Sequence, residues 1–278
     1  LTVANGFTNE GLIELRGRDA WNNTAALAVT AGALTNAATG TVRGAGDNPG
    51  AGNSINAELR NRGTIDVLQS MQVGNSGRTF DITNGMLNVA AGKTLTVTGG
   101  GAVTMGATVV NGSGTLELAG AQTLDLAGDV ILPAGGLTLA PSGTVTVNGP
   151  GTLINEGNTL NIGGETFNTA FLNKGAATVS STSAFTDVDN RGTLTVSAVG
   201  SNTSGVSGLL TNAGSLILAA GGGSSSEDVT LTVANGFTNE GLIELRGRNA
   251  WSNTAALAVT AGARSEEHTS ELQSHHPI

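Results

Sequence analysis

The sequence predicts an all-β fold in which short strands wind into a stack of coils, and three observations lead to this class. Residues 1–33 return as residues 231–263, with only two differences, Asp19/Asn249 and Asn22/Ser252. A shorter phrase containing Asn and Gly recurs inside this 230-residue unit, and apolar residues alternate with Thr, Asp or Glu between its copies. Repeats within repeats are typical of solenoids, in which each coil packs only on its neighbours.

The repeat region is expected to span residues 1–263, with a long unit of residues 1–230 that restarts at 231. From Arg264 the composition changes abruptly, and residues 264–274 resemble the translation of a sequencing-library adapter. We therefore expect residues 264–278 to be a disordered, non-native tail. Because the chain also begins without an initiator Met, we expect it to be a fragment of a longer protein.

Composition restricts the chemistry and the partners. Gly supplies 43 of 278 residues, 3% are aromatic, 12% are charged, and there is no Cys. The hydrophobic share of 38% comes in regular alternation, which favours a narrow core of small aliphatic residues over disorder. A net charge of −9 disfavours nucleic acid as a partner. No apolar run approaches the roughly 20 residues of a membrane-spanning helix, so we expect no membrane span.

The Asn-Gly phrase predicts the corners of the coils. Both residues tolerate left-handed backbone conformations, which suits a turn between strands. The alternation that follows, as in Ile65/Val67 and Leu194/Val196, predicts a strand with one buried face. In parallel coils the Asn side chains would stack as a ladder of hydrogen bonds. The predicted corner ladder comprises Asn9, Asn61, Asn84, Asn111, Asn155, Asn173, Asn190, Asn212 and Asn239.

These Asn residues lie 17 to 27 residues apart, except for gaps of 52 and 44, and Asn36 fills most of the first gap. An antiparallel meander with Asn-x-Gly hairpins is the alternative. The parallel solenoid is favoured because two-residue hairpin loops prefer Asn and Gly directly adjacent. Further strands are expected at residues 94–97, 115–118, 123–126, 137–139 and 144–147, and longer loops at 44–54, 199–208 and 221–228.

The Asn-x-Gly phrase and residues 112–128, GSGTLELAGAQTLDLAG, resemble passenger regions of bacterial autotransporters and filamentous-haemagglutinin-type adhesins. The likeness covers about residues 1–263. It implies a right-handed parallel β-helix (β-solenoid), here with coils of about 17–27 residues. It also implies secretion across the outer membrane and display at the cell surface for adhesion or aggregation. The implied partners are a host-surface or matrix protein, a glycan, or further copies of the same protein.

Few residues outside the tail could carry catalysis. All three His residues lie in the tail, so the rest of the chain cannot assemble a Ser-His-Asp triad. The chain has no Cys, so it has no Cys nucleophile either. The usual zinc ligands are missing for the same reason, and we expect no metal and no cofactor. Asp187 and Asp189 flank Val188 and should project from one outer strand face, which makes them the candidates for a β-helix polysaccharide lyase or glycosidase. The other carboxylates considered are interpreted as solvated strand and corner positions: Asp66, Asp125, Glu10, Glu14, Glu240 and Glu244.

Two further patterns bear on function. Trp21 and Trp251 hold the same place in the two long copies, and are interpreted as covering the core beneath a loop rather than stacking on a sugar. Thr-x-Thr occurs at residues 94–96, 144–146 and 193–195, which raises an ice-binding solenoid as an alternative, although the coil lengths vary too much for one regular plane. The leading hypothesis is a non-enzymatic stalk or adhesion repeat of a large secreted or cell-surface bacterial protein.

Overall fold

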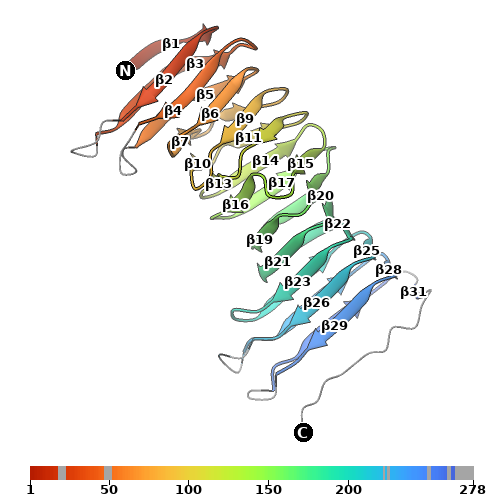
Figure 1. The fold of residues 1–278 in the computed structure, drawn as a ribbon. Helices are drawn as coiled ribbons and strands as arrows, with labels where there is room; N and C mark the ends of the chain where they lie inside the picture. The colour runs from red at the N-terminus through yellow and green to blue at the C-terminus, as the bar shows by residue number, and fades with distance from the viewer. Residues whose placement is uncertain are drawn as a thin grey trace. The chain divides into compact units, whose positions relative to one another are not determined.

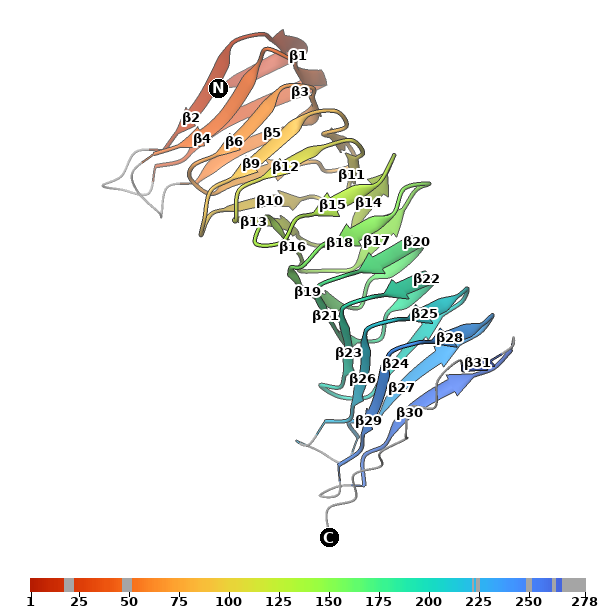
Figure 2. The ribbon, with the colours of Figure 1, turned by 45° about the vertical axis from the view of Figure 1, so that its right-hand side comes forward.

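The protein is described by a computed structural model that covers residues 1–17, 23–46, 52–221, 223, 226–248, 252–261 and, for the backbone, 264–266. These residues form strands and turns, and none of them lies in a helix. The described part therefore holds no helix that could cross a bilayer. The chain divides into two compact units, Leu1–Gly151 and Thr152–Ile278, and each is a stack of β coils (Figures 1 and 2).

The coils of the first unit have three faces, named here in the order in which a coil visits them. Three long strands each cover the first and second faces: β1 (Thr2–Asn9), β3 (Ala25–Asn36) and β5 (Asn53–Asn61). The first face continues with β7 (Met71–Gly74), β10 (Thr94–Thr98), β13 (Thr115–Leu118) and β16 (Thr138–Pro141). The second continues with β8 (Thr79–Asp81), β11 (Ala102–Met105), β14 (Gln122–Leu126) and β17 (Val145–Asn148). The third holds β2 (Leu12–Arg16), β4 (Thr41–Ala45), β6 (Thr64–Val67), β9 (Met86–Val89) and β12 (Val109–Asn111). Strand β15 (Val130–Leu132) follows β14.

The second unit repeats the three faces. Strands β20 (Thr166–Asn173) and β22 (Ala184–Asn190) each cover the first and second faces. The first face continues with β24 (Asn202–Val206), β27 (Val229–Val233) and β30 (Ala255–Val259). The second also holds β18 (Leu153–Asn155), β25 (Leu210–Asn212), β28 (Phe237–Asn239) and β31 (Arg264–Glu266). The third holds β19 (Thr159–Gly163), β21 (Ala176–Ser181), β23 (Thr193–Ser197), β26 (Ser215–Ala219) and β29 (Leu242–Arg246).

Neighbouring coils within each unit are joined by parallel strand pairs. Examples are β10 with β13, where Leu95 lies opposite Leu116, and β23 with β26, where Leu194 lies opposite Leu216. This confirms the parallel solenoid, and the antiparallel meander is wrong. Alternation is also confirmed at Ile65 and Val67, which are both 0% exposed and point into a narrow aliphatic core.

The strands expected from alternation are present at β10, β13, β14, β16 and β17. The loop expected at residues 199–208 is wrong, because β24 lies inside it. This strand turns Asn202 and Ser204 inward, each 1% exposed, beside the buried Val206. Two of its three buried positions are therefore polar, and the hydrophobic alternation does not reveal the strand. Of the other two expected loops, residues 47–51, 222, 224 and 225 lie outside the described residues, as do Trp21 and Trp251.

The tail that was expected to be disordered begins with β31, whose backbone pairs in parallel with β28. Arg264 lies opposite Phe237 and Glu266 lies opposite Asn239. Residues 267–278 lie outside the described residues.

Candidate functional site

The Asn corner of the second unit is a continuous ladder of side-chain amides. Each Nδ2 donates a hydrogen bond to the Oδ1 of the Asn in the next coil. The donor–acceptor distances are 2.9 Å for Asn155–Asn173, 2.8 Å for Asn173–Asn190, 2.7 Å for Asn190–Asn212 and 2.7 Å for Asn212–Asn239. These pairs are 18, 17, 22 and 27 residues apart, which confirms the expected coil length in this unit.

The first four rungs of this ladder, Asn155 to Asn212, also bind a backbone carbonyl oxygen of the next coil. For example, Nδ2 of Asn190 donates to the carbonyl oxygen of Ser215 at 3.0 Å as well as to Asn212. Asn155, Asn173, Asn190 and Asn212 are all 0% exposed. Buried amides that are fully paired in this way stabilise the stack, whereas an unpaired one would destabilise it.

The first unit has a shorter ladder, and Asn36 belongs to it. Asn9 donates to Asn36 at 2.8 Å, and Asn36 donates to Asn61 at 2.7 Å. In the next coil the strand register runs Leu59 to Phe80 and Arg60 to Asp81, which brings Ile82 to the position that follows Asn61. Since Ile82 is fully buried and apolar, Nδ2 of Asn61 bonds instead to the carbonyl oxygens of Gly63 and Met86.

Asn84 and Asn111 were predicted to belong to the ladder and do not. Both are exposed. Asn84 has a φ of 57° and supplies the left-handed conformation of a tight turn. Asn111 ends β12 opposite Asn88. Gly directly follows Asn at both places, whereas a residue separates Asn from Gly in the predicted positions that do join the ladders. The spacing between Asn and Gly therefore distinguishes a turn from a rung.

Gly in the Asn-x-Gly phrase has a different role from the one expected. In the second unit a Cβ on Gly192, Gly214 or Gly241 would overlap the carbonyl oxygen of the matching Gly in the preceding coil. None of these glycines has a left-handed φ. At these three positions Gly is needed because the coils approach closely, and not because of backbone conformation.

A second set of buried amides lies where the third face turns into the first face, and sequence reasoning missed it. Asn53 accepts a hydrogen bond from the Gly17 N–H at 3.0 Å and donates to the Ala45 carbonyl oxygen at 2.9 Å. Asn202 donates to the Val179 and Ser197 carbonyl oxygens at 3.1 and 2.7 Å. A signal was present in the sequence, since Asn is directly followed by Ser or Thr at Asn53, Asn202 and Asn253.

The candidate catalytic pair, Asp187 and Asp189, lies on β22 with both side chains half-buried on the outer side of Val188. Oδ1 of Asp187 accepts a hydrogen bond from the Leu209 N–H at 2.7 Å. Oδ2 of Asp189 pairs with Arg191, with distances of 3.0 Å to Nε and 2.7 Å to Nη2. The hydrogen bond to the Asp189 carboxylate raises the pKa of Arg191, so this guanidinium stays charged. Both carboxylates thus carry structural contacts.

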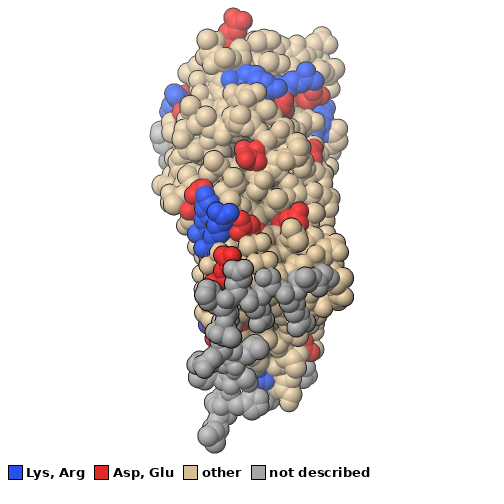
Figure 3. Space-filling view, turned by 90° about the vertical axis from the view of Figure 1, so that its right-hand side faces the viewer, with Lys and Arg blue, Asp and Glu red and all other residues tan. Residues whose placement is uncertain are grey.

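Of the other carboxylates considered, Glu10 and Glu240 are exposed, and the half-buried Asp125 accepts a hydrogen bond from Nδ2 of Asn148 at 3.3 Å. Asp66 pairs with Arg43 at 2.9 Å, while Glu14 and Glu244 pair with the Arg two residues later. Figure 3 shows acidic and basic groups close together on one face, on a surface that is mostly uncharged. Among the described residues no group of three or more His, Cys, Asp or Glu could hold a metal ion.

Glu165 is a buried carboxyl that the sequence did not single out. It lies in the turn between β19 and β20, is 1% exposed, and its Oε2 accepts the Gly163 N–H. The strand register aligns it with Ser183 and Ser204 in the next two coils. Burial raises the pKa of Glu165, and hydrogen bonds from its own backbone N–H and from the Gly163 N–H offset only part of this effect.

We expect Glu165 to make stability depend on pH. Because its pKa is raised on folding, the folded state binds the proton more tightly, and stability is lost as pH rises from the ordinary Glu pKa of about 4.3 through the raised value. Glu165→Gln should therefore raise the thermal midpoint near neutral pH and change it less at about pH 4. Thermal unfolding at several pH values measures this. The exposed Glu10→Gln is the control, and an equal response of the two variants would contradict the assignment.

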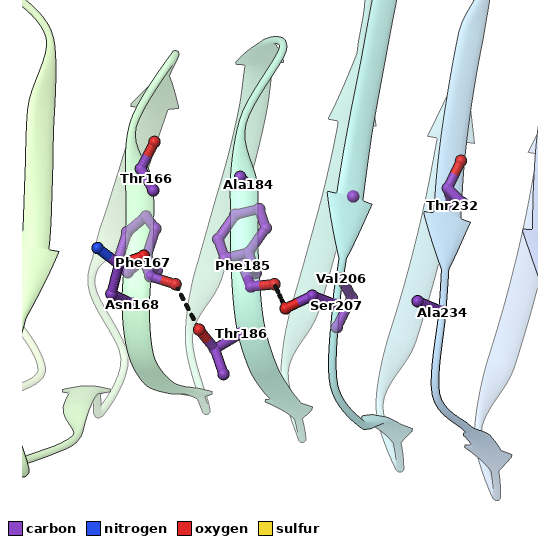
Figure 4. A pocket seen from close by; sticks show the side chains of 11 residues that line it. Thr166, Phe167, Asn168, Ala184, Phe185, Thr186, Val206, Ser207, Thr232 and Ala234 are labelled. Atoms are coloured by element: carbon purple, nitrogen blue, oxygen red, sulfur yellow. Dashed lines mark hydrogen bonds between the residues drawn. The ribbon is translucent and has the colours of Figure 1, made fainter. Parts of the chain in front are cut away.

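A shallow hollow of about 260 Å³ opens on the second unit where the first face turns into the second (Figure 4). Its base includes Phe167 and Phe185, whose rings stack with centroids 4.9 Å apart. On its rim the hydroxyls of Thr186 and Ser207 donate to the carbonyl oxygens of Phe167 and Phe185 at 3.0 and 3.3 Å. No lining residue is ionisable, so the hollow offers no acid or base.

The threonine rows are short. On the first face of the first unit Thr94, Thr115 and Thr138 stand in register over three coils. On the third face of the second unit Thr178 and Thr195 are followed by Ile217. Within the described residues these rows do not extend into a wide regular plane of hydroxyls.

Comparison of the chain with protein-family models, with curated proteins and with solved structures found no match. The fold and the contacts described above therefore carry the functional argument.

Proposed function

We propose that this chain is part of a non-enzymatic stalk or adhesion repeat of a large secreted or cell-surface bacterial protein. The observation that carries the proposal is the Asn ladder, in which buried side chains join each coil to the next at 2.7–2.9 Å across five coils of the second unit. A stack held together in this way needs only nearest-neighbour contacts, so it can be lengthened by adding coils. Repetition of a binding surface along such a stack multiplies its valency.

The placement of the polar groups supports a structural role. Asp187 accepts a hydrogen bond from the Leu209 N–H and so links its coil to the next one. Asp189 pairs with Arg191 and so balances its charge. The hollow beside Phe167 and Phe185 is lined by Thr, Ser, Asn and apolar residues. Hydroxyl and amide groups of this kind suit contacts with a matrix protein or a glycan at the surface, which are the partners we propose together with further copies of the protein.

We expect the purified chain to leave a panel of acidic and neutral polysaccharides intact, with and without calcium. Reducing-end and unsaturated-product assays measure hydrolysis and lyase cleavage separately. Turnover that disappears in Asp187→Ala and Asp189→Ala, but survives in Asp66→Ala, would establish the lyase or glycosidase alternative instead. Because Asp187→Ala also removes a backbone hydrogen bond worth about 1 kcal/mol, each variant is compared at equal folded fraction.

Adhesion is tested directly by displaying the chain on a non-adherent bacterium. We expect cells that carry it to bind arrays of matrix proteins or glycans, or to aggregate with one another, more than cells that carry the anchor alone. Equal binding of the two kinds of cell, together with no aggregation, would contradict an adhesive role and leave that of a spacer. Thermal hysteresis in a freezing assay would instead favour the ice-binding solenoid.

A further inference from the structure

The two long copies are covered by neighbouring coils on different sides, although their strands have the same sequence. The first copy is residues 1–33, and the second copy is residues 231–263. Leu1 is 85% exposed, whereas its counterpart Leu231 is 2% exposed. The reason is that β27 of the second copy packs on β24 of the preceding coil, while among the described residues β1 pairs only with β3.

The opposite edge shows the reverse pattern. In the first copy Leu15, Leu27 and Val29 are 7%, 3% and 1% exposed, because the next coil packs on them. Their counterparts Leu245, Leu257 and Val259 are only half-buried. Each copy therefore shows one half of the environment that this sequence occupies when coils pack on both sides.

The first copy shows which coil fits the edge formed by β28, β29 and β30 in the second. Phe7 lies opposite Leu34, and Asn9 donates to Asn36 at 2.8 Å. Strand β2 pairs along its whole length with β4, from Leu12 opposite Thr41 to Arg16 opposite Ala45. In the second copy the backbone of β31 takes the place on β28 that residues 34–36 take on β1, since Arg264 lies opposite Phe237 and Glu266 opposite Asn239.

The edge itself is conserved between the copies. The two differing positions lie between β2 and β3 in the first copy and between β29 and β30 in the second, outside the paired strands. The preceding coil also fits, because Leu210 lies opposite Phe237 and Asn212 donates to Asn239 at 2.7 Å. The same strands therefore accept a coil like residues 202–219 on one side and a coil like residues 34–67 on the other.

We infer that a further coil with the sequence of residues 34–67 stacks on the edge formed by β28, β29 and β30, so that successive copies of the 230-residue unit join coil on coil where they meet. The partner of this edge is thus another copy of the unit. In the same way, a coil with the sequence of residues 202–219 stacks on the edge of β1 and β2. The inference rests on the proposed role as a stalk, which it deepens by stating how the stalk is extended.

The test replaces residues 264–278 with a copy of residues 34–67 and measures amide hydrogen exchange. Peptides that contain Ser252 differ in mass from their first-copy counterparts, which contain Asn22, so the two copies are read separately. We expect exchange in β29 and β30 to slow by about tenfold or more in the extended chain, because their open backbone groups gain partners. The rates should approach those of β2 and β3 in the same molecule.

The matched control carries the same extension with Leu34→Ser, Val42→Ser and Leu59→Ser in the added copy only. All three positions are 0% exposed in the first unit, so the control extension has no core to bury. Exchange in β29 and β30 that is equal in the extended chain and in this control would overturn the inference. That result would leave the adhesion and turnover assays unaffected. Failure of the added coil to stack on this edge can therefore be distinguished from failure of the proposed function.

Discussion

Gly192→Ala is expected to destabilise the second unit by about 3 kcal/mol. Its Cβ would overlap the carbonyl oxygen of Gly175 and crowd Lys174 in the preceding coil, and all of the crowded atoms belong to the backbone. Relief would require the coils to separate beyond the usual strand spacing of about 4.7–4.9 Å. Urea unfolding followed by circular dichroism at the β-sheet band measures the loss.

The matched control is Gly11→Ala, which changes the same position of the phrase in the first coil. A Cβ there has no neighbour within 4 Å, and its φ is not left-handed. We expect a change within about 0.5 kcal/mol, as for ordinary surface substitutions. Equal effects of the two variants would rule out close approach of the coils as the reason for Gly at this position of the phrase.

Asn190→Ala is expected to cost about 2–4 kcal/mol. Asn190 is 0% exposed, accepts from Asn173 at 2.8 Å and donates to Asn212 at 2.7 Å and to Ser215 at 3.0 Å. Its removal leaves a buried acceptor on Asn212 and a buried carbonyl oxygen with fewer partners, and it also opens a cavity. Equilibrium unfolding of the variant and the parent chain at one pH gives the difference.

Asn111→Ala serves as the control, because Asn111 was predicted as a rung but lies exposed at the end of β12. We expect this change to be close to neutral. Asn190→Asp adds a further comparison, since it keeps the shape but places a charge on a buried position and removes the donor. A ladder that tolerated Asn190→Ala as well as Asn111→Ala would mean that the amides contribute little to holding the coils together.

Much of the fold follows from two regularities in the sequence. Apolar alternation located β10, β13 and β14, because one face of each strand is buried and the period is two. Asn recurrence located most rungs of both ladders, since one buried amide per coil must find its partner in the next coil. Strand β24 was not predicted from the sequence. Its inward side chains Asn202 and Ser204 are polar and are satisfied by hydrogen bonds, which a pattern of alternating apolar residues does not reveal.

The same limit explains what was missed at the candidate site. Glu165 is buried by its place in the turn and by the coils around it, and a single Glu after two Gly residues carries no mark of that burial. The ladder of the first unit ends at Ile82 because register, which depends on loop length, brings an aliphatic residue to the corner. Asn84, which is followed directly by Gly, lies two residues beyond that position. Register between distant segments is set by the whole coil, so a local pattern cannot fix it.

The amides of each ladder all donate in the direction of the growing chain, from Asn155 toward Asn239 and from Asn9 toward Asn61. A column built in this way has two chemically unlike ends, one with a carbonyl oxygen to offer and one with an N–H. A coil added at the N–H end must therefore present an acceptor there, as the Asn of a coil of the same sense does. Directionality of assembly is therefore built into a single type of side chain.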